Sequence, residues 1–313
     1  MSTTASPPEI QSSNLEQQGS QPCCPTCAAK PHEEVGPGEQ FAFAIGKVDM
    51  RFPNLGLERE FQRVAQGKNA GANRRGEPIA AVLREHRHIS ARVCPLLLIA
   101  NVPAYVVAPA SSHIRDALID ALAAGDKPDQ WVTVIGRLGP PCRPTDCAGV
   151  VAPILFADEI YSFSVGEWSA DLARALKAAI QAKKTTEKAL VSVATEVFSS
   201  VVNSLQNSGA TDQHRALNYV LLRHPGLFLA AAERSGRAVL EKIETRQVPA
   251  LASRRQVAVV LSFVDSATGV VERLFSRIDV TDEWPFIAGS AEGTPGPLGF
   301  QPFIENEIIG PGI

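Results

Sequence analysis

Cysteine is the residue type whose spacing most directly indicates chemistry in this sequence. Cys23, Cys24 and Cys27 form the run CCPTC near the N-terminus. A Cys-x2-Cys spacing on a tight turn suits tetrahedral Zn²⁺, because two thiolates on one turn can share the ion. His32 is the nearby nitrogen ligand, and a fourth ligand is still needed. These residues either contribute to a zinc site or belong to a flexible linker that carries cysteines.

A second pair of cysteines, Cys142 and Cys147, lies in the Pro-rich segment CRPTDC that follows a predicted strand. Its spacing could place two sulfurs on one ion, with the shell completed by the N-terminal cysteines or by a second copy of the chain. The alternative is a surface loop with two unpaired thiols. Because neither cluster provides four ligands alone, we expect no bound cofactor, with Zn²⁺ as the alternative.

Charged and amide side chains form a second candidate site. Arg215 and Asn218 are three residues apart in a predicted helix, so their side chains share one face. Asp279 and Asp282 follow at the end of the last long predicted strand and offer the carboxylates that Arg215 lacks. We interpret the four residues either as an ion-paired clamp between helix and sheet or as the polar rim of a peptide-binding groove.

Motifs of the common catalytic classes are missing from the sequence. It contains no HExxH and no GxSxG, and neither Gly-Lys pair is followed by the Ser or Thr of a phosphate-binding loop. No catalytic residue is therefore assigned, and binding is favoured over catalysis. The alternative is an enzyme that tailors or cleaves a peptide with Zn²⁺ at the cysteines, since catalytic groups come together in space rather than in sequence.

The elements that must position these residues are strands, then helices, then strands. Apolar alternation predicts strands in four regions, namely 41–48, 95–109 as a hairpin, 131–165 as several strands, and 239–280. Periodicity and capping residues predict early helices at 57–64, 78–86 and 111–122. This order predicts an α+β fold, with antiparallel or mixed sheet elements at both ends of the chain and a central helical section.

Three helices are predicted in that central section. Apolar residues four apart place one helix from Trp168 to Ile180 and a second over 189–205. The third begins with a cap at Thr211 or the next residue, carries Arg215, and is ended by Pro225.

The two ends of the chain differ in composition from this body. Residues 1–38 are rich in Ser, Gln, Pro and Glu and lack aromatic residues, which predicts a disordered tail. The folded domain is placed at 39–287. Residues 288–313 form a second, Gly/Pro-rich tail. Because this tail keeps Phe300 and Phe303, it could dock on the body or on a partner.

Four segments of the sequence resemble a known family. In order they are FAFAIGKVDMRFPNLGLEREF, VIGRL with the following GVVAPILF, ATDQHRALNYVLLRHP, and FSRIDVTDEWPF. They are similar to the C-terminal domain of the cyanobactin maturation proteases PatG and PatA, over about residues 40–287. The resemblance implies an accessory domain in bacterial biosynthesis of ribosomally made, modified peptides. It supplies no catalytic residues, and the protease motifs of the family do not occur in this sequence.

Composition limits the remaining function classes. The 313 residues are 45% hydrophobic and 20% charged, as in ordinary globular proteins. A formal net charge of −3 argues against a protein that coats nucleic acid. Prolines interrupt the most apolar stretch, 93–110, and no export signal is visible, so we expect a cytoplasmic protein without a membrane span. The expected partners are a precursor peptide, a maturation enzyme or a second copy of the chain.

Overall fold

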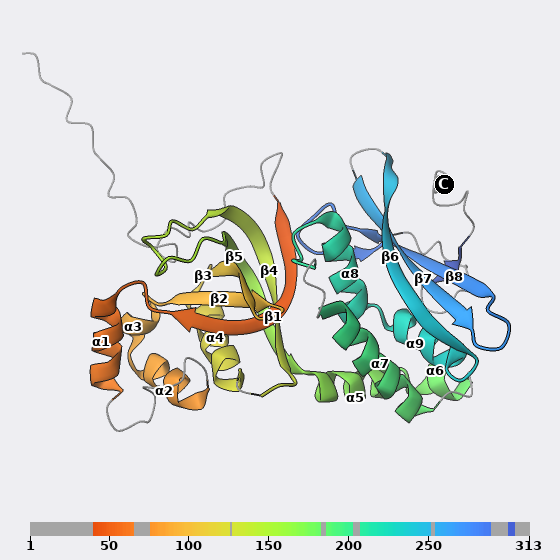
Figure 1. Ribbon diagram of the computed structural model, residues 1–313, viewed down its shortest axis with the longest axis horizontal. Helices are drawn as coiled ribbons and strands as arrows, with labels where there is room; N and C mark the ends of the chain where they lie inside the picture. Colours follow the sequence, from red (N-terminus) through yellow and green to blue (C-terminus); the bar gives the residue numbers. More distant parts are fainter. Residues whose placement is uncertain are drawn as a thin grey trace, which may run out of the picture.

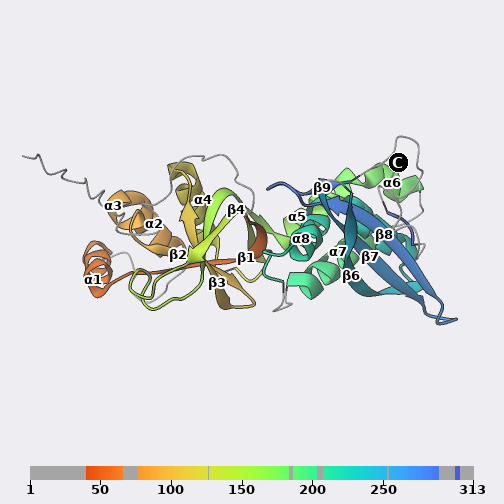
Figure 2. The same cartoon turned by 90° about the horizontal axis from the view of Figure 1, so that it is seen from above.

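The computed structural model describes residues 40–65, 76–125, 127–182, 186–202, 207–251, 254–288 and 300–303. Its elements form two lobes that lie end to end along the long axis of the molecule (Figures 1 and 2). The barrel lobe comprises the described residues up to 164, and the sheet lobe comprises those from 165 onwards. Strands occur at both ends of the chain and helices between them, which confirms the α+β prediction.

Five strands of the barrel lobe close into a barrel in the order β1-β2-β3-β5-β4. The strands are β1 (Phe41–Arg51), β2 (Cys94–Ile99), β3 (Val102–Pro109), β4 (Gln130–Pro141) and β5 (Pro153–Ser164). Neighbouring strands are antiparallel except β3 and β5, which are parallel. Within 131–165, predicted as several strands, the second half is largely the single strand β5, which continues along β4 through a register shift.

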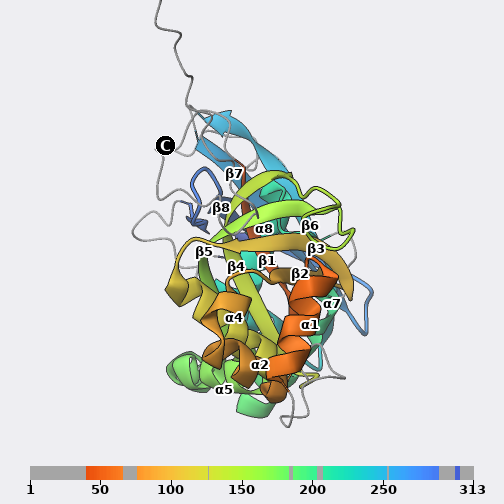
Figure 3. The same cartoon turned by 90° about the vertical axis from the view of Figure 1, so that its left-hand side faces the viewer.

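The helices of the barrel lobe gather on one side of the barrel, as Figure 3 shows for α1, α2 and α4. They are α1 (Leu55–Val64), α2 (Glu77–Glu85), α3 (Arg87–Ser90) and α4 (Ser112–Ala124). The predicted cap at Ser111 is confirmed, because its hydroxyl accepts a hydrogen bond from the Ile114 amide at 3.2 Å. Buried apolar residues of these helices pack with the strands in one core.

The sheet lobe contains an antiparallel sheet in the order β10-β8-β7-β6, with β9 also paired to β8. Its strands are β6 (Ala238–Leu251), β7 (Arg254–Asp265), β8 (Val271–Asp279), β9 (Phe286–Ile287) and β10 (Gln301–Pro302). Residues 300–303, placed in the C-terminal tail by composition, therefore dock on the body. Phe300 is fully buried there.

Five helices belong to the sheet lobe, and α8 and α9 pack directly on one face of its sheet. They are α5 (Val165–Ala175), α6 (Lys177–Ala182), α7 (Glu187–Val202), α8 (Asp212–Arg223) and α9 (Pro225–Arg234). The helix predicted over 168–180 is interrupted at Leu176, which caps α5. Pro225 ends α8 as predicted, but it also begins α9, which the sequence reading missed, because a helix tolerates proline in its first turn. None of the described helices is long and apolar enough to cross a membrane.

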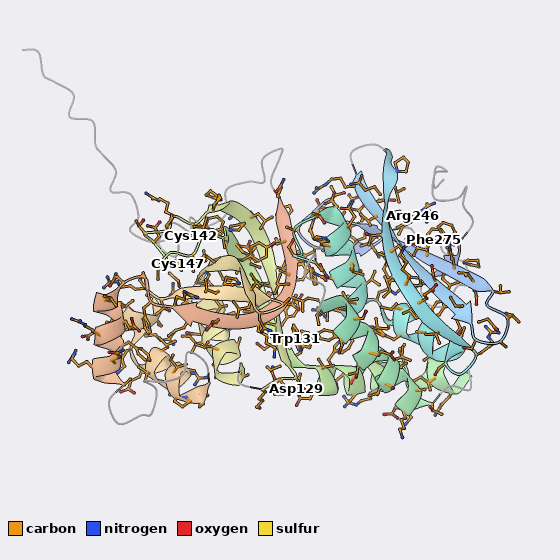
Figure 4. All side chains as sticks on the ribbon, in the orientation of Figure 1. Asp129, Trp131, Cys142, Cys147, Arg246 and Phe275 are labelled. Atoms are coloured by element: carbon orange, nitrogen blue, oxygen red, sulfur yellow. The ribbon has the colours of Figure 1, made fainter. Side chains whose placement is uncertain are left out.

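An aromatic cluster joins the two lobes where β5 runs directly into α5. Trp131 of β4, labelled in Figure 4, lies 5.5 Å from the ring of Phe198 on α7. Trp168 on α5 packs at 5.5 Å against the same ring and at 5.3 Å against Phe228 on α9. Such ring contacts add to the energy of burial. The lobes thus share an apolar joint.

Candidate functional site

Helix α8 brings the two sequence-predicted residues Arg215 and Asn218 to the boundary between the lobes. Thr211 caps the helix, because its side-chain oxygen accepts a hydrogen bond from the His214 amide at 3.2 Å. Their spacing puts both residues on one buried face, and each side chain is 1% exposed. Fully buried charged side chains are rare unless they are paired or hydrogen-bonded, so the partners decide their role.

Arg215 contacts main-chain carbonyls beyond β8. Its guanidinium donates to the carbonyl of Val280 at 2.7 Å, to that of Glu283 at 3.0 Å, and to that of Asp282. The Asp212 carboxylate is 3.7 Å away on the same helix. Burial lowers the pKa of Arg215 to about 10. Arg215 therefore ties the helix to the segment after β8 through main-chain carbonyls, whereas the proposed clamp was a pairing with the carboxylates of Asp279 or Asp282.

The two aspartates predicted as partners of Arg215 face another arginine. Arg254 donates to the buried carboxylate of Asp279 at 2.5 Å and to that of Asp282 at 3.3 Å. Burial alone would raise the pKa of Asp279, but the bonds from Arg254 and Thr281 outweigh it and lower the pKa. The sequence does not indicate which arginine pairs with Asp279 and Asp282. Only the fold brings Arg254, rather than Arg215, to their carboxylates.

Asn218 links the sheet lobe to the barrel lobe. Its amide nitrogen donates to the carbonyl of Phe43 on β1 at 2.7 Å, and its oxygen accepts from Asn207 at 2.7 Å. The Phe43 amide in turn donates to the carbonyl of Gly209 at 2.9 Å. The α8 residues thus act as a structural connection between lobes, and their hydrogen-bonding groups point into the protein.

A pair of carboxylates lies beside this connection. Glu283 and Asp158 are in hydrogen-bond contact, and Arg137 is 3.9 Å from Asp158. Burial raises the pKa of Glu283, and the Asp158 charge raises it further. The buried Oε1 of Glu283 has no hydrogen-bond partner among the described residues. The pair could hold a proton. It was missed because its members are far apart in sequence and come from different lobes.

Cys142 and Cys147 lie together in the barrel lobe (Figure 4). They are 2% and 0% exposed and share an apolar cluster with Cys94, so the thiols of this surface loop are buried rather than exposed. Burial raises the pKa of Cys142 to about 11. A hydrogen bond from Cys94 and the charge of Arg51 lower the pKa of Cys147.

No ligand set for a metal is assembled in the part of the chain that the structure describes. Cys23, Cys24 and Cys27, with His32, lie outside the described residues. Cys94, which the sequence reading did not single out, is a third thiol beside Cys142 and Cys147 only in the folded chain. Zinc binding at these cysteines stays a prediction.

Two serine–histidine contacts were not predicted. His214 Nδ1 lies 3.3 Å from Ser208 Oγ, and His224 Nε2 lies 3.1 Å from Ser276 Oγ. Burial lowers the pKa of both imidazoles, that of His224 to about 4. Within the described residues neither ring is bonded to the carboxylate that orients the base in hydrolytic triads. These contacts are typical of packed polar side chains.

An open groove lies on the sheet lobe beside β6. It has a volume of about 440 Å³ and is lined by residues of α7, α8, α9 and β6. Its wall is about equally polar and apolar, because Val193, Val197 and Leu240 line it together with Glu196, Ser200 and Lys242. Among the described strands β6 pairs only with β7, so its other edge keeps unpaired backbone groups next to the groove. No sequence motif indicates this site, because three helices and a strand form it jointly.

Comparison with known proteins gives one family. No protein with curated function matches the sequence. A solved structure described as "PatG Domain of Unknown Function" has the same fold, with a TM-score of 0.59 at 17% identity, over 80% of this chain and 97% of that one. The sequence profile of the PatG domain matches residues 41–257. That match covers more than half of the chain and confirms the resemblance: the chain belongs to the PatG domain family.

Proposed function

We propose that this chain is a non-catalytic accessory domain in the cytoplasmic maturation of a ribosomally made, modified peptide, and that it binds an extended segment of the precursor peptide along β6. The family and the sequence resemblance support the biosynthetic context. The observation that carries binding is the groove of about 440 Å³ beside an unpaired strand edge.

The chemistry of the β6 edge suits a peptide in extended conformation. A peptide strand added there would satisfy the free backbone groups of β6, and these bonds do not depend on sequence. Alternate side chains of the added strand would point into the groove between β6 and α7, where apolar and polar residues would select among them. A second copy of the chain could use the same edge, and it is one outcome of the test below.

Calorimetric titration with the precursor peptide encoded beside the gene tests this proposal. Ser200 is exposed on α7 and lines the groove, so Ser200→Trp should fill it and weaken binding at least tenfold. Ser199→Trp changes the neighbouring exposed residue outside the groove and should bind normally. A peptide methylated at alternate backbone nitrogens should also bind less tightly, because it cannot complete the strand ladder.

Three results would count against the proposal. Equal binding by Ser200→Trp and Ser199→Trp would place the peptide elsewhere. Absence of heat at millimolar peptide would remove the peptide as partner. A concentration-dependent dimer that Ser200→Trp dissolves would assign the edge to a second copy of the chain.

A further inference from the structure

The face of the sheet opposite the helices carries a small apolar cluster between arginines. Val248, Ala258, Val260 and Phe275 are buried there, and Phe303 packs on them from the segment that contains β10. Figure 4 shows Arg246 and Phe275 on this part of the sheet. We call this surface the arginine–phenylalanine face.

The Phe303 ring is held by cations rather than by deep burial. The guanidinium of Arg246 lies 5.2 Å from the ring centre, and that of Arg273 lies 5.9 Å from it. The ring meets that of Phe275 edge-on at 6.1 Å. Its backbone amide donates to the carbonyl of Arg273 at 2.9 Å. Cations stacked on an aromatic ring attract it, and the strength of this attraction rises when water is excluded.

Positive charge on this face exceeds the negative charge available to it. Lys242 lies 2.7 Å from the carboxylate of Glu244, and Arg246 lies 4.0 Å from it. The hydrogen bond from Lys242, with the charges of Arg246 and Arg273, lowers the pKa of Glu244. Among the described residues of this group, the carboxylate of Glu244 is thus the only one beside the three cations Lys242, Arg246 and Arg273. Arg273 is exposed and makes no ion pair with any described residue.

The sequence after Phe303 has the complementary charge. Glu305 and Glu307 follow it at intervals of two residues. Residues two apart share one face of an extended chain, so an aromatic residue followed by acids at these positions would present ring and carboxylates together. Residues 304–313 lie outside the described part of the structure.

We propose that the arginine–phenylalanine face is a docking site for an extended peptide segment of a partner, with an aromatic residue followed by carboxylates two and four residues later, and that Phe303 occupies its aromatic position in the free chain. The apolar floor takes the ring, and Arg246 and Arg273 take the acids. The site lies across the sheet from the β6 groove and does not rest on the function proposed above.

Fluorescence anisotropy with a labelled synthetic peptide of residues 302–309 tests the site. The full chain with Phe303→Ala should bind this peptide at least tenfold more tightly than the unchanged chain, because a tethered ring competes at millimolar effective concentration. Adding Arg273→Glu should weaken binding at least tenfold. A peptide with Gln at both acidic positions should bind more weakly by a similar factor. Raising the salt concentration should weaken binding of the acidic peptide most.

Arg59→Glu in the Phe303→Ala chain is the matched control, because Arg59 is exposed on α1 of the other lobe. It should leave binding unchanged. If a thermal melt shows that the Phe303→Ala chain is not folded, Phe303→Leu is the variant to test in its place, because it keeps the apolar contact without a ring. Lack of binding at 1 mM peptide by a folded variant overturns the proposal. Equal binding of the acidic and Gln peptides overturns it as well.

Discussion

Two regions of the sheet lobe use arginine in opposite ways. At the lobe boundary Arg215 is 1% exposed, and its two terminal nitrogens donate to three main-chain carbonyls within the protein. On the arginine–phenylalanine face Arg273 is exposed and contacts an aromatic ring without an ion pair among the described residues. A buried side chain that bonds to distant main-chain groups fixes the structure, whereas an exposed cation without an ion pair is accessible to a ligand. The residues most visible in the sequence therefore belong to the framework.

The largest expected effect separates these two arginines directly. Arg215→Ala leaves buried carbonyls without donors and should lower the free energy of unfolding by about 3–5 kcal/mol. Arg273→Ala should change it by less than about 1 kcal/mol, because the side chain is exposed. Urea unfolding of both variants measures the difference. Similar losses for both would contradict the assignment of Arg215 to the framework.

Acid should destabilise the fold through the buried histidine His224. Burial lowers the pKa of His224 from 6.5 to about 4, so the unfolded chain takes up the proton at higher pH than the folded chain. The contribution of neutral, buried His224 to the free energy of unfolding is complete above pH 6.5. It falls by about 3 kcal/mol as the pH falls to about 4. His224→Gln should flatten this part of the stability profile. His113→Gln, at an exposed position, is the control and should keep the wild-type slope.

Two glycines with positive φ extend the comparison between the buried lobe boundary and an exposed region to the backbone. Gly209 has φ +78°, and a Cβ there would lie 2.4 Å from the carbonyl oxygen of Phe43 across the lobe boundary. Gly269 has φ +70° in the β7–β8 loop with open space around it. Gly269→Ala should cost about 1 kcal/mol from backbone strain alone. Gly209→Ala should lower the free energy of unfolding by at least about 1 kcal/mol more than Gly269→Ala does, as measured by thermal melts. Equal costs would mean that the lobes separate readily here.

The smallest expected effect is a coupling energy. Asp279 pairs with Arg254, not with Arg215, so Arg215→Ala and Asp279→Ala should act independently. Their double-mutant coupling should stay below about 0.5 kcal/mol. Arg254→Ala with Asp279→Ala is the positive control and should be coupled. A large coupling between Arg215 and Asp279 would restore the carboxylate clamp that the sequence suggested.

Local features of the fold could be predicted from the sequence. The sequence predicts Ser111 as a helix cap and Thr211 as one of two candidates for another, because a capping side chain needs only its own helix turn. The β2–β3 hairpin followed from two apolar runs around Asn101, which has φ +65° and is a residue type that tolerates this conformation. In each case the signal and the structure lie within a few residues of each other.

Features that depend on distant residues could not be predicted. The parallel pairing of β3 with β5, which closes the barrel, has no local signature. The contact between Asp158 and Glu283 and the β6 groove arise only when several elements meet. For the same reason the sequence located Arg215 at the end of β8 but could not choose between carboxylate and carbonyl as its partner.

The burial of Phe300 has a consequence for synthesis of the chain. All five barrel strands lie within residues 41–164, so the barrel can close while the sheet lobe is still being made. The core of the sheet lobe includes Phe300, whose ring lies 4.6 Å from that of His224. At typical elongation rates of about 5–20 residues per second, about 7–28 s separate the completion of the two sets of residues. During that interval α5–α9 and β6–β8 emerge without their last core residue, and their apolar faces are open to chaperones.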